Sequence, residues 1–153
     1  MNKIVVLDTG PLGMVTNPRA SPEIDRCNLW LQDLLANNIR VIIPEIADYE
    51  IRRELLRAGK RKGLARLDDL KGIIDYAPIT TRAMLKAAEL WAETRNRHRP
   101  TADDKALDGD VILAAQAILV ADQEKQVVVA TTNVGHLEWF IKAREWKDIH
   151  FSE

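Results

Sequence analysis

The sequence has few of the features on which several protein classes depend. Its single cysteine, Cys27, cannot form an intramolecular disulfide, which agrees with a reducing compartment. The longest apolar stretches, such as Val111–Ala121, are too short and too interrupted to span a bilayer. Asp8 ends the first apolar run, and no small-residue cleavage site follows it. We therefore expect a cytoplasmic protein with no signal peptide and no membrane association.

Two further absences narrow the chemistry. No set of His and Cys residues has the spacing of a zinc site, and no glycine-rich phosphate loop is present, which disfavours zinc enzymes and nucleoside-triphosphate enzymes. A net charge of −1 gives no overall sign of nucleic-acid binding. With 46% hydrophobic and 29% charged residues, the chain has the composition of a soluble globular protein. Its length fits one domain over residues 1–153.

The charges are unevenly distributed along the chain. Seven basic residues stand between positions 51 and 67 against one acid, Glu54, and a second basic cluster spans Arg95–Arg99. The acids gather elsewhere, notably at Asp103, Asp104, Asp108 and Asp110. This segregation predicts an acidic pocket beside a basic rim, although the basic run alone also fits a solvated helix face. Its members are Arg52, Arg53, Arg57, Lys60, Arg61, Lys62 and Arg66.

Apolar strand patterns alternate with helical ones, which predicts a parallel sheet covered on both faces. Ser21 is the expected cap of one helix, and Asp8 with Gly10 and Pro11 is typical of a turn. Strands are expected at Lys3–Leu7, Ile39–Ile43, Ile73–Ile79 and Val127–Ala130, with Trp146–Phe151 as a possible fifth. Helices are expected over about 22–36, 45–60, 62–70 and 81–95, and from Asp108 or Gly109 to Ala121.

Ligand sites in such a sheet form beyond the carboxyl ends of the strands, where Asp8 directly follows the first strand. Asp8 is a candidate site carboxylate, or else a turn or cap residue. Glu50 borders the apolar side of its helix, whereas Glu45 suits the helix dipole and Asp48 is expected on the surface. Asp110 is a further candidate.

Two further regions, one at a helix start and one after a strand, stay open to two interpretations. Asp108 is expected to cap the last long helix, which also explains its position without a site. Thr131, Thr132 and Asn133 follow a buried strand and form either a polar site rim or a helix cap, and His136 alone fits a structural histidine best. Carboxylates that converge at one sheet edge suit Mg²⁺ or Mn²⁺, which prefer oxygen ligands.

Four blocks of the sequence, in order, resemble those of PIN domains. The first runs from Ile4 through Asp8 to Leu12, and the second is Ile43–Glu50, with its acid six residues after the proline. The third opens with Asp110 before an alanine-rich apolar helix, and the last ends its strand in Thr131-Thr132-Asn133. In the second block, this register favours Glu50 over Glu45.

The resemblance implies a three-layer α/β/α Rossmann-like sandwich with a central parallel sheet. It also implies a Mg²⁺- or Mn²⁺-dependent endoribonuclease, commonly a homodimer, and many bacterial members are VapC-type toxins held by a small antitoxin. The metal ligands and catalytic residues would be Asp8, Glu50 and Asp110, with Thr9, Thr131 and Asn133 in support. From electrostatics alone, Arg52, Arg53, Arg57 and Arg97 are expected to contact RNA.

The chain departs from the family pattern in the last block, which has no acid between Asn133 and His136. Asp108 is a possible replacement for that carboxylate. The departure keeps open an alternative function, in which a PIN-like domain binds RNA or a protein with weak or no nuclease activity. A phosphatase with Asp8 as nucleophile is disfavoured, because Gly10 stands where its second aspartate is needed.

Overall fold

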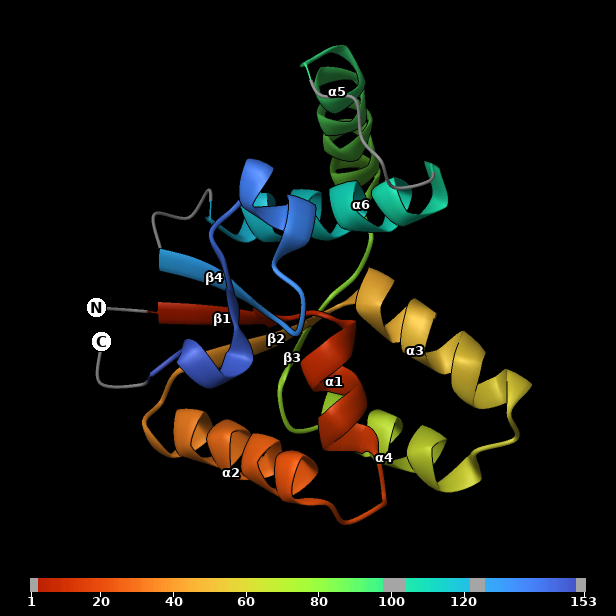
Figure 1. Ribbon diagram of the computed structural model, residues 1–153, viewed down its shortest axis with the longest axis vertical. Coiled ribbons are helices and arrows are strands. Elements are labelled where there is room, and N and C mark those ends of the chain that lie inside the picture. The colour runs from red at the N-terminus through yellow and green to blue at the C-terminus, as the bar shows by residue number, and fades with distance from the viewer. Residues whose placement is uncertain (1–2, 98–103, 122–125, 151–153) are drawn as a thin grey trace.

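The computed structural model describes residues 3–97, 104–121 and 126–150. Five parallel strands form one sheet in the order β3-β2-β1-β4-β5 (Figure 1). Because every pair is parallel, all the carboxyl ends lie at the same edge of the sheet. The strands are β1 (Lys3–Leu7), β2 (Arg40–Pro44), β3 (Asp75–Ala77), β4 (Gln126–Thr131) and β5 (Ala143–Glu145).

Helices cover both faces of this sheet, which confirms the expected three-layer α/β/α architecture (Figure 1). The helices are α1 (Thr9–Thr16), α2 (Pro22–Ala36), α3 (Glu45–Arg57), α4 (Arg61–Lys71), α5 (Thr81–Arg97) and α6 (Asp104–Ala121). Two short 3₁₀ helices, η1 (Gly135–Trp139) and η2 (Trp146–Asp148), flank β5.

Alternate residues of the central strand supply the two cores. Val5 and Leu7 pack with side chains of α1, α2 and α4, whereas Ile4 and Val6 pack with side chains of α6 and η1. A third cluster joins α5 to α6, and Figure 1 shows α5 projecting from the body of the molecule beyond α6. The continuous apolar runs of β1 and β4 therefore reflect strands buried on both faces.

The segment after Asp8 is the helix α1, so the turn expected there was wrong. Asp8 is its N-cap, and a side-chain oxygen of Asp8 accepts a hydrogen bond from the backbone N–H of Thr9 at 2.7 Å. Pro11 lies in the first turn, where its missing N–H costs no intrahelical hydrogen bond. A sharp strand-to-helix junction at Asp8 follows from these local features.

The start of α6 and the last strand also differ from expectation. α6 begins at Asp104, one turn before Asp108, so Asp108 is not its N-cap. Trp146–Asp148 forms η2, and the fifth strand is the preceding segment, β5. Trp146 is buried against Trp30, with ring centroids 5.7 Å apart, so tertiary packing rather than strand pairing accounts for this apolar residue.

Two smaller expectations agree with the structure. Cys27 is buried in the core beside α1, and burial raises the pKa of its thiol to about 12, which fits a packing role. Ser21 caps α2 through a hydrogen bond from the N–H of Ile24 to its hydroxyl. Within the described residues, no helix is both long and apolar enough to cross a membrane.

Candidate active site

Asp8 occupies the carboxyl end of the central strand, at the junction of β1 and α1. One carboxylate oxygen accepts the N–H of Thr9, and the other accepts the hydroxyl hydrogen of Thr131 at 2.8 Å. The backbone N–H of Asp8 donates to the carbonyl of Ala130 on the adjacent strand. These contacts hold the orientation of the Asp8 carboxylate from both sides.

Thr131 ends β4 and is only 1% exposed. Besides donating to Asp8, its hydroxyl oxygen accepts the backbone N–H of Asn133 at 3.1 Å. The expected supporting residues therefore act in different ways. Thr131 contacts Asp8 through its side chain, Thr9 does so chiefly through its backbone, and Asn133 fixes Thr131 through its backbone.

Glu50 belongs to α3 and Asp110 to α6, and both Asp8 and Asp110 lie close enough to Glu50 for their charges to act on it. The pKa of Glu50 is raised, first by burial and then by the negative charges of Asp8 and Asp110, while Arg53 opposes the rise. The α6 backbone comes close as well, because a Cβ added at Gly109 would lie 3.1 Å from a Glu50 carboxylate oxygen. Three elements distant in the sequence thus bring three acids together.

Glu50→Gln is expected to stabilise the metal-free protein. Because the pKa of Glu50 is raised in the fold, its ionised form destabilises the fold; this destabilisation is complete above the folded pKa. Removing the charge should raise Tm at neutral pH by roughly 2–4 °C, the shift that about 1 kcal/mol produces in a domain of this length. Calorimetry in EDTA measures the effect.

The gain should disappear below the unfolded pKa of glutamate, near pH 4.3, where both states hold the proton. Glu54→Gln is the matched control, because Glu54 lies one turn along α3 and pairs with Arg57 at the surface. An unchanged or lower Tm for Glu50→Gln at neutral pH would contradict the raised pKa of Glu50.

Asp108 lies apart from this cluster. Its side chain is exposed and lines a small cavity between α5 and α6, together with Trp91, Val111 and other apolar residues. Two residues along a helix correspond to a rotation of about 200°, which separates the direction of Asp108 from that of Asp110. We therefore omit Asp108 from the proposed metal ligands.

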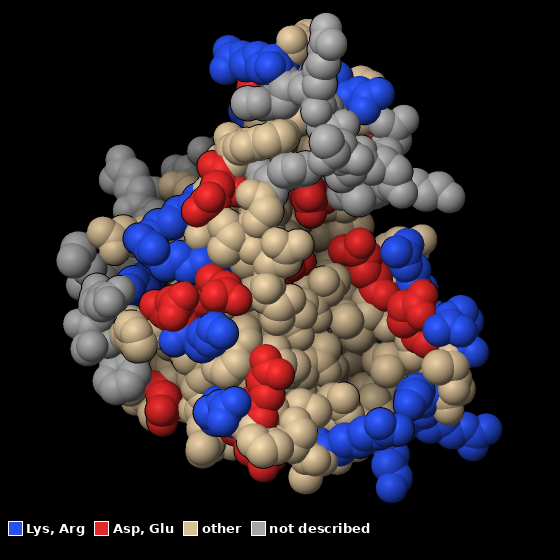
Figure 2. All heavy atoms as spheres, in the orientation of Figure 1, with Lys and Arg blue, Asp and Glu red and all other residues tan. Residues whose placement is uncertain are grey.

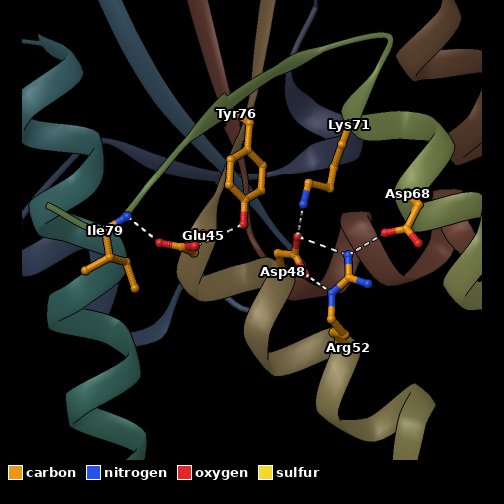
Figure 3. A network of polar contacts seen from close by, with 7 residues as sticks. All are labelled: Glu45, Asp48, Arg52, Asp68, Lys71, Tyr76 and Ile79. Carbon is orange, nitrogen blue, oxygen red and sulfur yellow. Dashed lines mark hydrogen bonds and ion pairs between the residues drawn. The ribbon is translucent and has the colours of Figure 1, made fainter.

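The expectation that Asp48 lies on the surface was wrong. Its side chain is 4% exposed and accepts from Arg52 at 2.7 Å, with Lys71 3.5 Å away (Figure 3). Burial alone would raise the pKa of Asp48, but Arg52, Lys71 and the hydroxyl of Tyr76 together lower it. The i,i+4 spacing of Asp48 and Arg52 was the sequence signal for this pair, and the burial was not visible in it.

This network connects the first turns of α3 to α4 and to the segment after β3 (Figure 3). Arg52 also donates to Asp68 of α4 at 2.8 Å, so ion pairs occupy its guanidinium. Glu45 accepts the backbone N–H of Ile79 at 2.6 Å and therefore has a structural contact of its own.

A second contact to the start of α3 comes from Gln116, which is buried on α6. Its side chain accepts the N–H of Ile46 and donates to the carbonyl of Ala77. These contacts fix the start of α3, the helix of Glu50.

The other expected RNA contacts are placed as follows. The Arg53 guanidinium lies over the Tyr49 ring, 5.1 Å from its centroid, and its charge reaches Glu50. Arg57 pairs with Glu54 on the exposed side of α3, and Arg97 is exposed at the end of α5. Of these arginines, Arg53 is the one whose charge acts on Glu50.

The donor set suits a hard divalent cation, because it consists of carboxylates that repel one another at one edge of the sheet. Among the described residues, no three His, Cys, Asp or Glu side chains are arranged so that they could hold a metal ion as they stand. Mg²⁺ commonly takes one or two carboxylates and keeps several waters. A Mg²⁺ ion bound directly by one or two of Asp8, Glu50 and Asp110, and otherwise by water, would have this coordination.

No protein-family model matches the sequence, and the search of curated proteins finds no match. The fold is similar to those of solved toxin–antitoxin structures. VapBC2 from Rickettsia felis, bound to a promoter DNA fragment, gives a TM-score of 0.69 at 18% identity over 94% of this chain and 98% of that chain. VapBC-1 from nontypeable Haemophilus influenzae gives 0.67 at 14% identity over 95% and 99%.

DNA-bound VapBC from Salmonella typhimurium gives a TM-score of 0.62 at 20% identity over 95% of this chain and 99% of that chain. At these identities the likeness is one of fold, and it extends over nearly the whole length of both chains. The resemblance of the four sequence blocks predicted the same fold. The chain thus has the PIN-type α/β fold of VapC proteins.

Proposed function

We propose that this protein is a divalent-metal-dependent endoribonuclease, the toxin component of a toxin–antitoxin pair. The observation that carries the proposal is the gathering of Asp8, Glu50 and Asp110 at the carboxyl edge of the sheet, close enough for the first and last to raise the pKa of the second. Carboxylates that lie close together repel one another, and a cation bound between them removes this repulsion.

The residues divide the work of RNA phosphodiester hydrolysis. Asp8 and Glu50, with Asp110, would hold Mg²⁺ or Mn²⁺ directly or through water. Thr131 and the N–H of Thr9 orient the Asp8 carboxylate. Arg53 draws the phosphate backbone toward the acids by its positive charge. When bound, such a metal activates water and stabilises negative charge developing on phosphate.

Cleavage of single-stranded RNA tests the proposal. The purified chain should cut a labelled oligonucleotide in the presence of Mg²⁺ or Mn²⁺ and should stop when EDTA is added. Isothermal titration with Mn²⁺ provides a second readout that does not depend on turnover. Absence of both cleavage and Mn²⁺ binding would refute the nuclease proposal.

A second candidate function is RNA binding without cleavage. Two observations favour it: the last sequence block lacks an acid, and no three-ligand group stands ready among the described residues. RNA binding that persists in EDTA, without any cleavage product under metal, would support this alternative.

A cavity of about 530 Å³ between α1, α3 and α4 is a candidate binding site for an antitoxin. Its floor includes Ile51 and Leu55, and its rim includes Arg19, Arg61 and Lys62. Figure 2 shows the basic side chains gathered over the ends of α3 and α4. An apolar floor with a cationic rim suits an acidic amphipathic segment, and we propose that the antitoxin docks there.

We further propose that the protein is a cytoplasmic homodimer. Light scattering can measure its oligomeric mass.

A further inference from the structure

Tyr49 is an aromatic side chain with an unusual position. It is 55% exposed, and it immediately precedes Glu50 on α3. Large apolar side chains on a surface usually occur singly and need no explanation. Tyr49 differs because a candidate site carboxylate is its neighbour and a cation contacts its ring.

Arg53 connects Tyr49 with the acid cluster. It follows Tyr49 by four positions and Glu50 by three, so on a helix it lies between the two side chains. Its guanidinium carbon is 5.1 Å from the Tyr49 ring centroid, and its charge lowers the pKa of Glu50 against the effect of burial. An aromatic ring, a guanidinium and a carboxylate thus lie on neighbouring positions of α3, with the guanidinium between the other two.

The neighbouring arginines of α3 have other partners. Arg52 is held between Asp48 and Asp68, and Arg57 pairs with Glu54. Arg53 is placed differently, because its guanidinium lies over the face of the Tyr49 ring, beside Glu50. A guanidinium there can contact a phosphate while the exposed ring offers a flat apolar surface.

We propose that Tyr49 and Arg53 bind one nucleotide of single-stranded RNA next to the bond that is cut. Tyr49 stacks on the base, and Arg53 contacts the adjoining phosphate. Single-stranded RNA is recognised in this way, by bases stacked on aromatic rings and guanidinium planes and by cations along the backbone. The inference rests on the proposed function, because it assigns the substrate contacts of the same site.

The ligand proposed for Tyr49 and Arg53 is RNA rather than a protein, because an exposed flat ring lies next to a positive charge. The ring alone would suit either, but Arg53 places a positive charge between it and the acid cluster. Arg57 lies one turn further along α3, so cations continue from Arg53 toward the basic rim at the end of the helix. A polyanion that crosses the site would meet them in succession.

The test compares Tyr49→Ala, Tyr49→Phe and the control Leu56→Ala, which removes another exposed apolar side chain of α3, 62% exposed. Fluorescence anisotropy measures the binding of a labelled single-stranded RNA in EDTA. Tyr49→Ala should raise Kd roughly 5- to 150-fold, the range that stacking of one base supplies. Tyr49→Phe should bind nearly as wild type, and Leu56→Ala should be unchanged.

An oligonucleotide with one abasic position sharpens the test. Moving the abasic site along the strand should reveal one position that weakens binding to wild type but does not weaken binding to Tyr49→Ala further. Arg53→Gln should reduce the dependence of log Kd on log salt concentration by about 0.7, the value for one phosphate of a single strand.

Equal binding by wild type and Tyr49→Ala would overturn the inference. So would a change of oligomeric mass in Tyr49→Ala with RNA affinity intact, because the residue would then belong to a protein interface. These outcomes are distinct from failure of the proposed function. If the wild type cleaves RNA and Tyr49→Ala binds RNA equally well, the nuclease proposal stands and the Tyr49 contact is refuted. If RNA binding depends on Tyr49 but no RNA is cleaved, the Tyr49 contact stands and the nuclease proposal is refuted.

Discussion

Asp8→Asn is expected to lower the rate of metal-dependent RNA cleavage by roughly 10²- to 10³-fold, the usual effect of removing one principal electrostatic group from an active site. The same variant should lose most of its affinity for Mn²⁺ in isothermal titration. Asp8 lies at the end of the middle strand, its charge acts on Glu50, and two donors orient its carboxylate. Removal of its charge takes away attraction for a cation without removing any bulk.

The fold should survive this substitution. Asparagine is as good an N-cap as aspartate, so the hydrogen bond from the Thr9 N–H can persist. The amide occupies the same volume, and the hydroxyl of Thr131 can donate instead to the carbonyl of Asn133, 3.1 Å away. A Tm that does not fall below the wild-type value would show that the lost activity reflects chemistry rather than unfolding, and relief of the repulsion between Asp8 and Glu50 should act to raise Tm in the metal-free protein.

Asp33→Asn is the matched control for charge. Asp33 is an exposed carboxylate of α2, and its removal changes the net charge of the protein by the same amount. It should leave cleavage and Mn²⁺ affinity at wild-type values. Full activity in Asp8→Asn would be incompatible with the proposed nuclease.

Asp48→Asn is expected to destabilise the protein by about 2–4 kcal/mol, because it removes the buried anion that balances Arg52 and Lys71. The loss of stability should stay below the upper end of that range, because Arg52 and Lys71 are partly exposed and can be hydrated, and Arg52 retains its ion pair with Asp68. Urea unfolding, with the transition midpoint and slope fitted together, measures the change.

Glu54→Gln serves as the comparison on the same helix. Its ion pair with Arg57 is exposed at both ends, and such pairs contribute about 0–1 kcal/mol. A loss in Asp48→Asn no larger than in Glu54→Gln would mean that the network in Figure 3 does not hold α3 in place.

The pH dependence of Asp48→Asn follows from the sign of the pKa shift. The pKa of Asp48 is lowered in the fold, so its contribution is complete above the unfolded value of about 3.9 and is lost as pH falls through the folded value. The stability difference between wild type and Asp48→Asn should therefore be constant near neutrality and shrink only below about pH 4. A difference that shrinks already at pH 6 would point to another group.

Local patterns predicted most of the elements, because the signals that form them act over a few residues. The apolar run of β1 and the Ser21 cap of α2 are read directly from neighbouring side chains. Boundaries were less accurate where two signals competed. Asp8 was expected to be a site carboxylate or else a turn or cap residue, and it caps the helix α1, which the pattern after it did not predict. Asp108 was assigned to a cap although α6 begins a turn earlier.

The candidate site was partly predictable for the same reason. Asp8 stands where a strand pattern stops, and the spacing from Pro44 selected Glu50 over Glu45. The structure gives Glu45 a separate task, the hydrogen bond to the N–H of Ile79. Asp48 could not be placed from its spacing, because a carboxylate two residues before Glu50 becomes buried only when α4 and Tyr76 pack over it.

By itself, the order of residues determined the alternation of strands and helices, the parallel character of the sheet and the identity of the acids that follow its strands. Only the tertiary structure decided which of those acids meet. Glu50 and Asp110 join Asp8 because α3 and α6 pack against the sheet edge, whereas Asp108 turns toward α5 and Asp48 toward α4. Periodicity along a chain sets the direction of a side chain relative to its own helix, but packing between helices sets what that side chain faces.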